Sequence, residues 1–409
     1  MSAAHILVAN VYFAPFSYGG ATIVAEEVAA ALQRTGRFRI TAVSLCVRED
    51  LAPYTVVKCQ KQGIENYLIN IPAQRSYGAT YDNPEITARL AELIGALEPD
   101  LVHAHCLQDM GTGIVTAAGA QGVPVILSVH DFWWLCERQF MIRLDGRYCG
   151  QSPVRIEACK GCAENFWAAK TRFAHLRETG AKVAAVTYPS AFARKLSEAS
   201  GFAPGRGLVW ENGVTLPGPD FFARQAARRE RDGRLCFGYL GGPSQIKGWP
   251  QIRGAFAQIG RRDFRGVVVD GSLNGSWWDA RNLRGLPGDW SVHPRFAQAE
   301  MDDFYAQIDV LLFMSQWKET FGLAIREALA RGIAVIQTDS GGTVEHGTIP
   351  PGELIPIGAP PERLARRIEA VLASAQRGQA PVSVAGFEDQ ARAFADLVDR
   401  VLQRDRRAA

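Results

Sequence analysis

The sequence lacks the features of a membrane-spanning or secreted chain. No stretch reaches the roughly 18–20 apolar residues that a helix needs to cross a bilayer. The amino terminus has no signal-peptide pattern, because its apolar run at residues 6–9 is short and leads into a Gly-rich loop. We therefore expect a cytoplasmic protein whose 8 cysteines are mostly reduced thiols.

The chain also has little net charge. Lys and Arg total 45 against 42 Asp and Glu, a formal net charge of +3, which argues against a nucleic-acid partner. Basic residues gather at Arg224, Arg228, Arg229, Arg231 and Arg234, and again at Arg404, Arg406 and Arg407. Such runs are usually solvated faces, and the alternative is peripheral contact with an anionic surface on the inner face of the cell membrane.

Internal repeats and low-complexity blocks are absent as well, whereas strand-like and helical patterns alternate over most of the 409 residues. Apolar runs typical of buried parallel strands lie at residues 6–11, 40–45, 125–129, 183–186, 235–240, 267–269, 310–314 and 334–337. Helical patterns lie at residues 23–32, 86–97, 321–330 and 361–373. This alternation predicts an α/β fold of two doubly wound, Rossmann-like domains.

The turn-rich segment Leu216-Pro217-Gly218-Pro219 is the best domain boundary. We expect a first domain at residues 1–216 and a second at 217–384, with ligands between them beyond the carboxyl ends of their strands. Residues 385–409 carry apolar side chains at three- and four-residue intervals, which predicts a terminal helix that packs back on the first domain.

Two loops of the first domain could bind a ligand. Gly19 and Gly20 lie between the first strand and the first helix, where backbone amides and the helix dipole can approach an anion; a plain tight turn is the alternative. His130 follows the strand at residues 125–129, and its imidazole could bond a sugar hydroxyl or bear developing charge. We interpret His103 and His105 as structural. The aromatic run Phe132-Trp133-Trp134 could stack a sugar ring or pack in the core.

In the second domain, the loop Gly241-Gly242-Pro243-Ser244-Gln245-Ile246-Lys247-Gly248 follows a strand. A Gly turn followed by Lys suits a diphosphate, although the spacing is not that of a P-loop. A surface lysine is the alternative interpretation of Lys247.

The segment from Glu319 to Glu327 is the most informative one. We expect Glu319 in the loop and Glu327 roughly two turns into the following helix. Backbone amides at Thr320-Phe321-Gly322-Leu323 would then face a phosphate at a helix start. Hydroxyl recognition explains the two carboxylates better than a bare phosphate does. A further Gly turn, Asp339-Ser340-Gly341-Gly342, is expected to offer more amides.

These motifs together resemble the retaining glycosyltransferases of the GT-B fold, family 4. The resemblance rests mainly on the motif Glu-x7-Glu, here Glu319 to Glu327, which is specific for this family. The other elements fall in the family's order over nearly the whole chain: Val102-His103-Ala104-His105, His130-Asp131, Asn212-Gly213, Lys247-Gly248 and Asp339-Ser340-Gly341-Gly342.

The resemblance implies a role for each matched residue. Glu319 would contact hydroxyls of the donor sugar, Glu327 the ribose, and Lys247 the leaving diphosphate, assisted by amides near Gly20 and Gly322. His130 would lie near the transferred sugar. The family keeps the anomeric configuration without a metal, and it uses a nucleotide-diphosphate sugar and a carbohydrate or lipid-linked acceptor, here expected in surface polysaccharide synthesis.

One departure from the family concerns Gly242, where the family usually has arginine. The loss of one phosphate contact would cost about 1.5–3 kcal/mol if nothing replaces it. A non-catalytic nucleotide-sugar-binding protein, or a GT-B epimerase or phosphorylase, is the alternative function.

Four cysteines, Cys136, Cys149, Cys159 and Cys162, follow His130 closely. Cys159 and Cys162 have the spacing of metal ligands, so one interpretation is a structural zinc site that orders a loop-like segment. A redox-labile pair and four unconnected thiols are the alternatives.

Metal analysis of the purified protein separates these interpretations. A structural site predicts about one zinc per chain, because four thiolates close a tetrahedral site. A stoichiometry well below one contradicts it.

Overall fold

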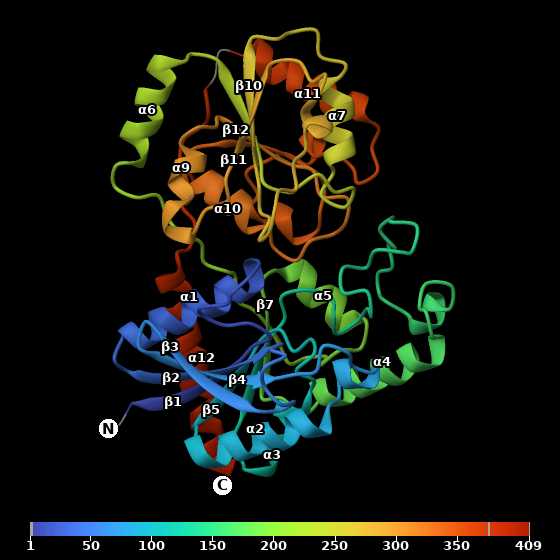
Figure 1. The fold of residues 1–409 in the computed structure, drawn as a ribbon, viewed down its shortest axis with the longest axis vertical. Coiled ribbons are helices and arrows are strands. Elements are labelled where there is room, and N and C mark those ends of the chain that lie inside the picture. Colours follow the sequence, from blue (N-terminus) through green and yellow to red (C-terminus); the bar gives the residue numbers. More distant parts are fainter. Residues whose placement is uncertain (1–2, 375–376, 409) are drawn as a thin grey trace. The chain divides into compact units, whose positions relative to one another are not determined.

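The computed structural model describes residues 3–374 and 377–408. The chain divides into two compact units: residues 1–141, 150–213 and 385–409 form unit 1, and residues 142–149 and 214–384 form unit 2. Each unit is a doubly wound α/β sheet, as the alternating pattern predicts (Figure 1).

Within the described residues, unit 1 has an eight-stranded sheet in the order β3-β4-β2-β1-β5-β6-β7-β8. Strand β3 pairs with β4 in antiparallel orientation and the other neighbours pair in parallel. The strands are β1 (Ala4–Ala9), β2 (Phe38–Cys46), β3 (Val56–Lys61), β4 (Ile64–Asn70), β5 (Leu101–Ala104), β6 (Val125–Ser128), β7 (Ala185–Tyr188) and β8 (Gly207–Val209). The helices are α1 (Gly20–Arg34), α2 (Pro84–Leu97), α3 (Gly113–Ala120), α4 (Phe166–Gly180), α5 (Ala191–Ala199) and α12 (Phe387–Ala408).

Unit 2 has a parallel five-stranded sheet in the order β11-β10-β9-β12-β13 among its described residues. Its strands are β9 (Leu235–Tyr239), β10 (Phe264–Val269), β11 (Asp289–His293), β12 (Val310–Phe313) and β13 (Ala334–Gln337). Its helices are α6 (Phe221–Arg231), α7 (Trp249–Phe256), α8 (Ala280–Leu283), α9 (Met301–Tyr305), α10 (Leu323–Ala330) and α11 (Pro361–Ala373).

Alternate residues of the unit 2 strands pack in two separate hydrophobic cores, one on each face of the sheet. On one face, Phe237 of β9 packs with apolar residues of α7 and α11. On the other face, Cys236 packs with apolar residues of α6, α9 and α10. Because helices cover both faces of the sheet, the strands carry apolar side chains on both sides. Their sequences are therefore continuous apolar runs.

The segment Asn212-Gly213 is held by the start of α12, inside unit 1. The side chain of Gln390 accepts a hydrogen bond from the Gly213 amide at 2.7 Å and donates one to Asn212 Oδ1 at 3.3 Å. The indole N–H of Trp210 donates to the Gln390 carbonyl at 3.0 Å. Helix α12 also packs along α1 (Figure 1).

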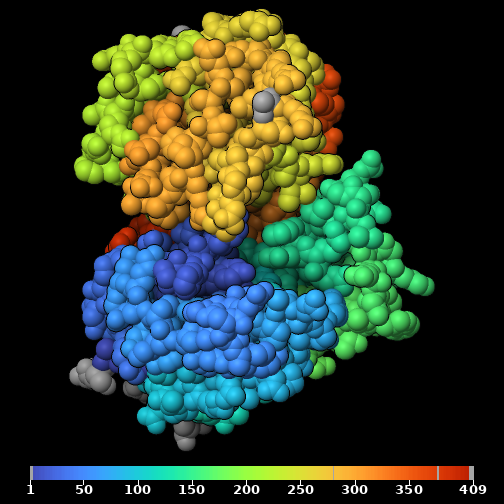
Figure 2. Space-filling view, in the orientation of Figure 1, coloured from blue at the N-terminus to red at the C-terminus, as the bar shows by residue number. Residues whose placement is uncertain are grey.

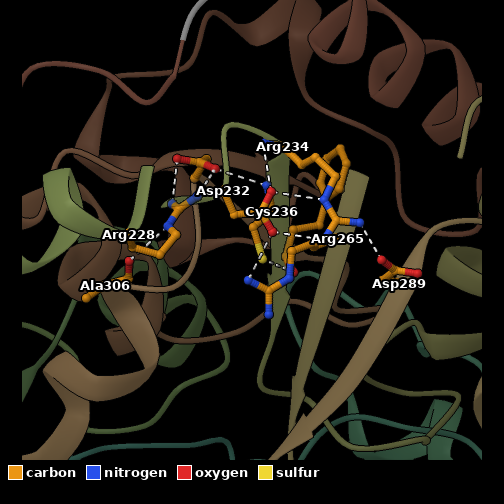
Figure 3. Close-up of polar contacts among 9 residues, drawn as sticks. Arg228, Asp232, Arg234, Cys236, Arg265, Asp289 and Ala306 are labelled. Atoms are coloured by element: carbon orange, nitrogen blue, oxygen red, sulfur yellow. Dashed lines mark hydrogen bonds and ion pairs between the residues drawn. The ribbon is translucent and has the colours of Figure 1, made fainter. Parts of the chain in front are cut away.

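The basic cluster at residues 224–234 is largely ion-paired. Asp309 is fully buried and accepts hydrogen bonds from Arg228 and Arg229 at 2.8–3.0 Å. Arg224 pairs with Asp303. Arg234 pairs with Asp232 and Asp289 (Figure 3).

Helix α6 lies at the surface (Figure 2), and its Arg224, Arg228 and Arg229 pair with Asp303 and Asp309 of the same unit. The side chains of Arg406 and Arg407 lie outside the described residues. None of the described helices is long and apolar enough to span a bilayer.

We predict that Gly213→Ala destabilises unit 1. A Cβ atom at position 213 would lie 2.4 Å from the Gly386 carbonyl oxygen, so the start of α12 would have to shift. Overpacking of this kind costs about 1–3 kcal/mol and should lower the thermal midpoint of unfolding. Gly119→Ala is the control, since that position on α3 has nothing within 4 Å of the added Cβ. Equal midpoints for the two variants would contradict the prediction.

Candidate functional site

Three loops of unit 2 meet beyond the carboxyl ends of β9, β12 and β13, which are neighbours in the sheet. Lys247, from the loop after β9, places its ammonium 2.8 Å from a carboxylate oxygen of Glu319, from the loop after β12. The backbone of Glu319 pairs with the loop after β13, since its amide donates to the Ser340 carbonyl at 3.0 Å and its carbonyl accepts from the Gly342 amide at 2.9 Å. The residues of three sequence motifs thus lie in one place.

Further contacts fix the carboxylate and the ammonium. The hydroxyl of Ser315 donates to the same oxygen of Glu319. The ammonium of Lys247 lies 5.5 Å from the centre of the Trp317 ring. The hydroxyl of Tyr239 donates to the carbonyls of Gly242 and Lys247 at 2.9 and 3.1 Å, which holds the loop that carries the lysine.

The start of α10 lies beside this ion pair and offers unpaired donors. Gly322 has φ 85° and caps the helix, which begins at Leu323. Within the described part of the chain, no backbone or side-chain group accepts a hydrogen bond from the amides of Phe321, Gly322 and Leu323. Amides at a helix start are suited to an anion. Thr320 is buried next to them.

The helix is shorter than the pattern predicts, because residues 321 and 322 belong to the loop. Glu327 is consequently only slightly more than one turn into α10. Its carboxylate is buried and accepts a hydrogen bond from the Tyr305 hydroxyl at 2.7 Å. Burial raises the pKa of Glu327, while the Tyr305 hydrogen bond and the nearby Arg331 act in the opposite direction.

In the loop after β13, which is expected to offer amides to a ligand, most amides are used within the protein. The Gly342 amide is used by Glu319, and the Thr343 amide donates to the Ser340 carbonyl at 3.4 Å. The guanidinium of Arg326 donates to the carbonyls of Phe321, Gly342 and Thr343. This loop therefore supports the Glu319 loop.

Gly242, the position that departs from the family, lies under an indole ring. Its φ is 66°, and a Cβ there would lie 2.8 Å from Trp277. The same indole covers Gly271, where a Cβ would lie 2.6 Å from it. A side chain at position 242 would thus compete with Trp277 for space. No sequence signal connects these positions, because they belong to different loops.

The candidate residues of unit 1 lie in two loops, one after β1 and one after β6. Gly19 has φ 86° and precedes α1, and both Gly19 and Gly20 are exposed. Thr22 closes the turn, since its hydroxyl accepts from the Tyr18 amide at 2.9 Å. His130, two residues beyond β6, has Nε2 2.9 Å from Nδ1 of His105. Burial lowers the pKa of His130 to about 4, so it is neutral at pH 7.

The aromatic run after His130 belongs to the core. Phe132, Trp133 and Trp134 are at most 6% exposed. Trp134 packs 4.9 Å from the ring of Phe202, and Arg172 lies over Trp133. Core packing, not sugar stacking, accounts for these residues.

Three of the four clustered cysteines line one small pocket of unit 1. Cys136, Cys159 and Cys162 share it with Arg172 and Phe173, whereas Cys149 belongs to unit 2. Among the described residues, no group of three or more His, Cys, Asp or Glu side chains is arranged to hold a metal ion. The zinc interpretation therefore stays a prediction.

Both halves of the chain match glycosyltransferase families. Residues 19–213 match the glycosyl transferase 4-like domain, and residues 234–374 match the glycosyl transferases group 1 family. No curated protein matches the chain significantly.

Solved structures share the fold over almost the full length. A glycosyltransferase from Rickettsia africae has a TM-score of 0.66 at 17% identity, with 98% of this chain and 99% of that chain covered. The Anabaena protein HepE in complex with UDP-glucose has a TM-score of 0.61 at 16% identity, with 99% and 98% covered. Sucrose-phosphate synthase from Thermosynechococcus elongatus has a TM-score of 0.62 at 15% identity, with 98% and 97% covered.

We predict that Gly242→Ala destabilises unit 2 more than Gly275→Ala does. Both glycines have positive φ, 66° and 74°, so an added side chain is strained at either position. Only Gly242 would also meet Trp277, because nothing lies within 4 Å of a Cβ at Gly275. The additional loss should be about 1–3 kcal/mol, measured by chemical or thermal unfolding. Equal losses would mean that the indole does not pack on Gly242.

Proposed function

We propose that this chain, a glycosyltransferase of the GT-B fold, moves a sugar from a nucleotide-diphosphate donor to a carbohydrate or lipid-linked acceptor with retention of anomeric configuration. The observation that carries the proposal is the Lys247–Glu319 pair beside the unpaired amides that start α10. Cation, amides and carboxylate together match a diphosphate that carries a sugar.

The charge that the protein must stabilise is the one that develops on the leaving diphosphate. Fixed donors that point at a developing charge lower the barrier most, since they need no reorganisation during the reaction. An ammonium has three donors, so Lys247 can keep Glu319 and still donate to a phosphate oxygen. The amides of Phe321, Gly322 and Leu323 add further donors, so this chemistry needs no metal.

The two carboxylates have separate roles in the proposal. Glu319 accepts hydrogen bonds from hydroxyls of the transferred sugar, next to the lysine that holds the diphosphate. Glu327 accepts from the ribose diol, and its hydrogen bond from Tyr305 sets the orientation of the carboxylate. In the proposal, His130 of unit 1 lies near the transferred sugar. The amides at Gly19 and Gly20 of the same unit help to bind the phosphates.

A uridine nucleotide is the donor class that we test first, since HepE is described in complex with UDP-glucose. Assembly of a surface polysaccharide in the cytoplasm, with the protein peripheral on the inner membrane face, is the setting that we propose. It rests on fold analogy.

Lys247→Ala and Glu327→Ala should each lose about 2–4 kcal/mol of transition-state stabilisation, or roughly 30- to 1000-fold in rate. The measurement is release of UDP from a panel of UDP-sugars in the presence of carbohydrate and lipid-linked acceptors. Lys318→Ala is the matched control, since this neighbouring lysine also pairs with a carboxylate, Asp339, at 2.9 Å. The control should keep near-normal activity.

Near-normal activity of Lys247→Ala would mean that the donor is misplaced. A wild-type protein that binds UDP in calorimetry but releases none from any sugar donor supports the alternative, a non-catalytic nucleotide-sugar-binding protein. Inversion at the anomeric carbon of the product, measured by NMR, would contradict the proposed retention of configuration but not the proposed sugar transfer.

A further inference from the structure

Two adjacent tryptophans of unit 2, Trp277 and Trp278, pack against the loop at residues 241–248, which we call the lysine loop. They lie between β10 and α8, and β10 is a neighbour of β9 in the sheet. A Cβ atom at Gly242 would lie 2.8 Å from the indole of Trp277, so this ring covers the first turn of the lysine loop. The ring centre of Trp278 lies 4.7 Å from that of Trp249, which begins α7 directly after the loop. The two tryptophans thus contact both ends of the lysine loop.

Trp277 is held in this place although it lies at the surface and is 40% exposed. The carboxylate of Asp270, directly after β10, accepts hydrogen bonds from the amides of Ser272 and Trp277 at 3.0 and 3.2 Å. It also accepts one from the Ser276 hydroxyl. The indole covers Gly271 as well, where a Cβ atom would lie 2.6 Å from it. These contacts fix both the backbone and the ring of Trp277 against the lysine loop.

The turn that Trp277 covers is coupled to the lysine itself. The Tyr239 hydroxyl lies 2.9 and 3.1 Å from the carbonyl oxygens of Gly242 and Lys247, so the two ends of the loop share one donor. A Cβ atom at Gly241 would lie 2.8 Å from Cβ of Lys247, so the turn also touches the lysine side chain. A displacement of the turn would therefore move Lys247.

The loop after β12 holds the lysine loop on its other side. The amide of Gln316 donates to the carbonyl of Ile246 at 2.7 Å, and Gly248 lies against the carbonyl of Met314. Two consecutive glycines at the start of the lysine loop have large conformational freedom, which an ordered loop must lose. Trp277 restrains these glycines on the side of β10.

We propose that Trp277 is a positioning residue of the donor site, which holds the Gly241-Gly242 turn and thereby keeps the ammonium of Lys247 in place. This role rests on the function proposed above, because Trp277 acts on the leaving diphosphate only through Lys247. Fixed donors stabilise a developing charge best when they need no reorganisation, and small misplacements are costly. The absence of a side chain at Gly242 makes room for the ring.

The first test needs no ligand. The amides of Ser244 and Gly248 are hydrogen-bonded within the lysine loop at 2.8 and 3.0 Å, so their exchange with deuterium reports opening of the loop. The measurement is hydrogen–deuterium exchange of the full-length protein, by mass spectrometry of peptides that cover residues 241–249. In Trp277→Ala we expect exchange there to be at least about fivefold faster, because the turn loses its contact on one side. Trp277→Phe keeps a ring on the glycines and should restore most of the protection.

An unchanged exchange rate in Trp277→Ala overturns the proposal. Leu273→Ala is the matched control, since Leu273 is a large apolar residue of the same loop and is 60% exposed. It should leave exchange in the lysine loop unchanged, and an equal acceleration in both variants also overturns the proposal. Trp278 is unsuited to this test, because it is 7% exposed and its truncation would leave a cavity in the core of unit 2.

The second test separates positioning from stability. The dissociation constant of UDP is measured by calorimetry for the wild type and the three variants, below the thermal midpoint of each. We expect Trp277→Ala to weaken UDP binding about tenfold, because the lysine loop must then be ordered on binding. Trp277→Phe and Leu273→Ala should bind UDP nearly as the wild type does. Unchanged UDP binding in Trp277→Ala overturns the positioning role.

The two tests distinguish this role from the proposed transfer. A wild type that binds no UDP contradicts the uridine donor proposed above, whereas the exchange rates still decide whether Trp277 holds the lysine loop. A wild type that transfers sugar, together with unchanged exchange in Trp277→Ala, supports the transfer and rejects the role of Trp277.

Discussion

The ion pair between Lys247 and Glu319 is the contact on which the candidate donor site depends. It joins the loops after β9 and β12, and the backbone bonds of Glu319 attach the loop after β13. Both side chains retain some exposure, 34% and 13%, so the pair contributes little to the free energy of unfolding. Its contribution is positional, because it places a cation beside the amides that start α10.

The second acidic residue is held in a different way. Glu327 is buried, and its neighbour Arg331 is fully buried and paired with Asp302 at 2.6 Å. Removing charges from water costs about as much as their mutual attraction returns. Such pairs are better understood as fixing geometry. Here the Tyr305 hydroxyl holds the carboxylate of Glu327, and Arg331 donates to the backbone carbonyl of Glu327 at 3.1 Å, in a site where burial raises the pKa of that carboxylate.

The fold could be predicted from the sequence wherever a strand is buried on both faces, because β1, β2, β6, β9, β12 and β13 are apolar runs. The edge hairpin β3–β4 was missed, since β3 carries exposed polar residues and has no continuous apolar run. The short edge strands β8 and β11 are half-exposed and were missed for the same reason.

The motifs of the candidate donor site could be predicted because each follows a strand, and parallel strands bring their carboxyl ends to one edge. The side chains that support these motif residues could not be predicted from the sequence. Tyr239, Trp277 and Tyr305 hold the site through contacts that depend on loop paths and strand order. His103 lies within β5, and its hydrogen bond to Ser128 of β6 depends on the register of these two strands, which no local pattern specifies.

The candidate side chains of unit 2 are charged, whereas the imidazoles of unit 1 are neutral, and the proposed reaction explains this difference. Unit 2 pairs charges with charges, as suits a site for a diphosphate. Unit 1 instead places three imidazoles, those of His103, His105 and His130, in contact with one another, and burial lowers the pKa of each. When the donor bond breaks, positive charge develops on the sugar while negative charge develops on the leaving group. An imidazolium beside that sugar would oppose the positive charge, since like charges disfavour one another in a water-poor site. A neutral His130, as the proposed function has it, can bond a sugar hydroxyl without this penalty, and burial keeps it neutral over the physiological pH range.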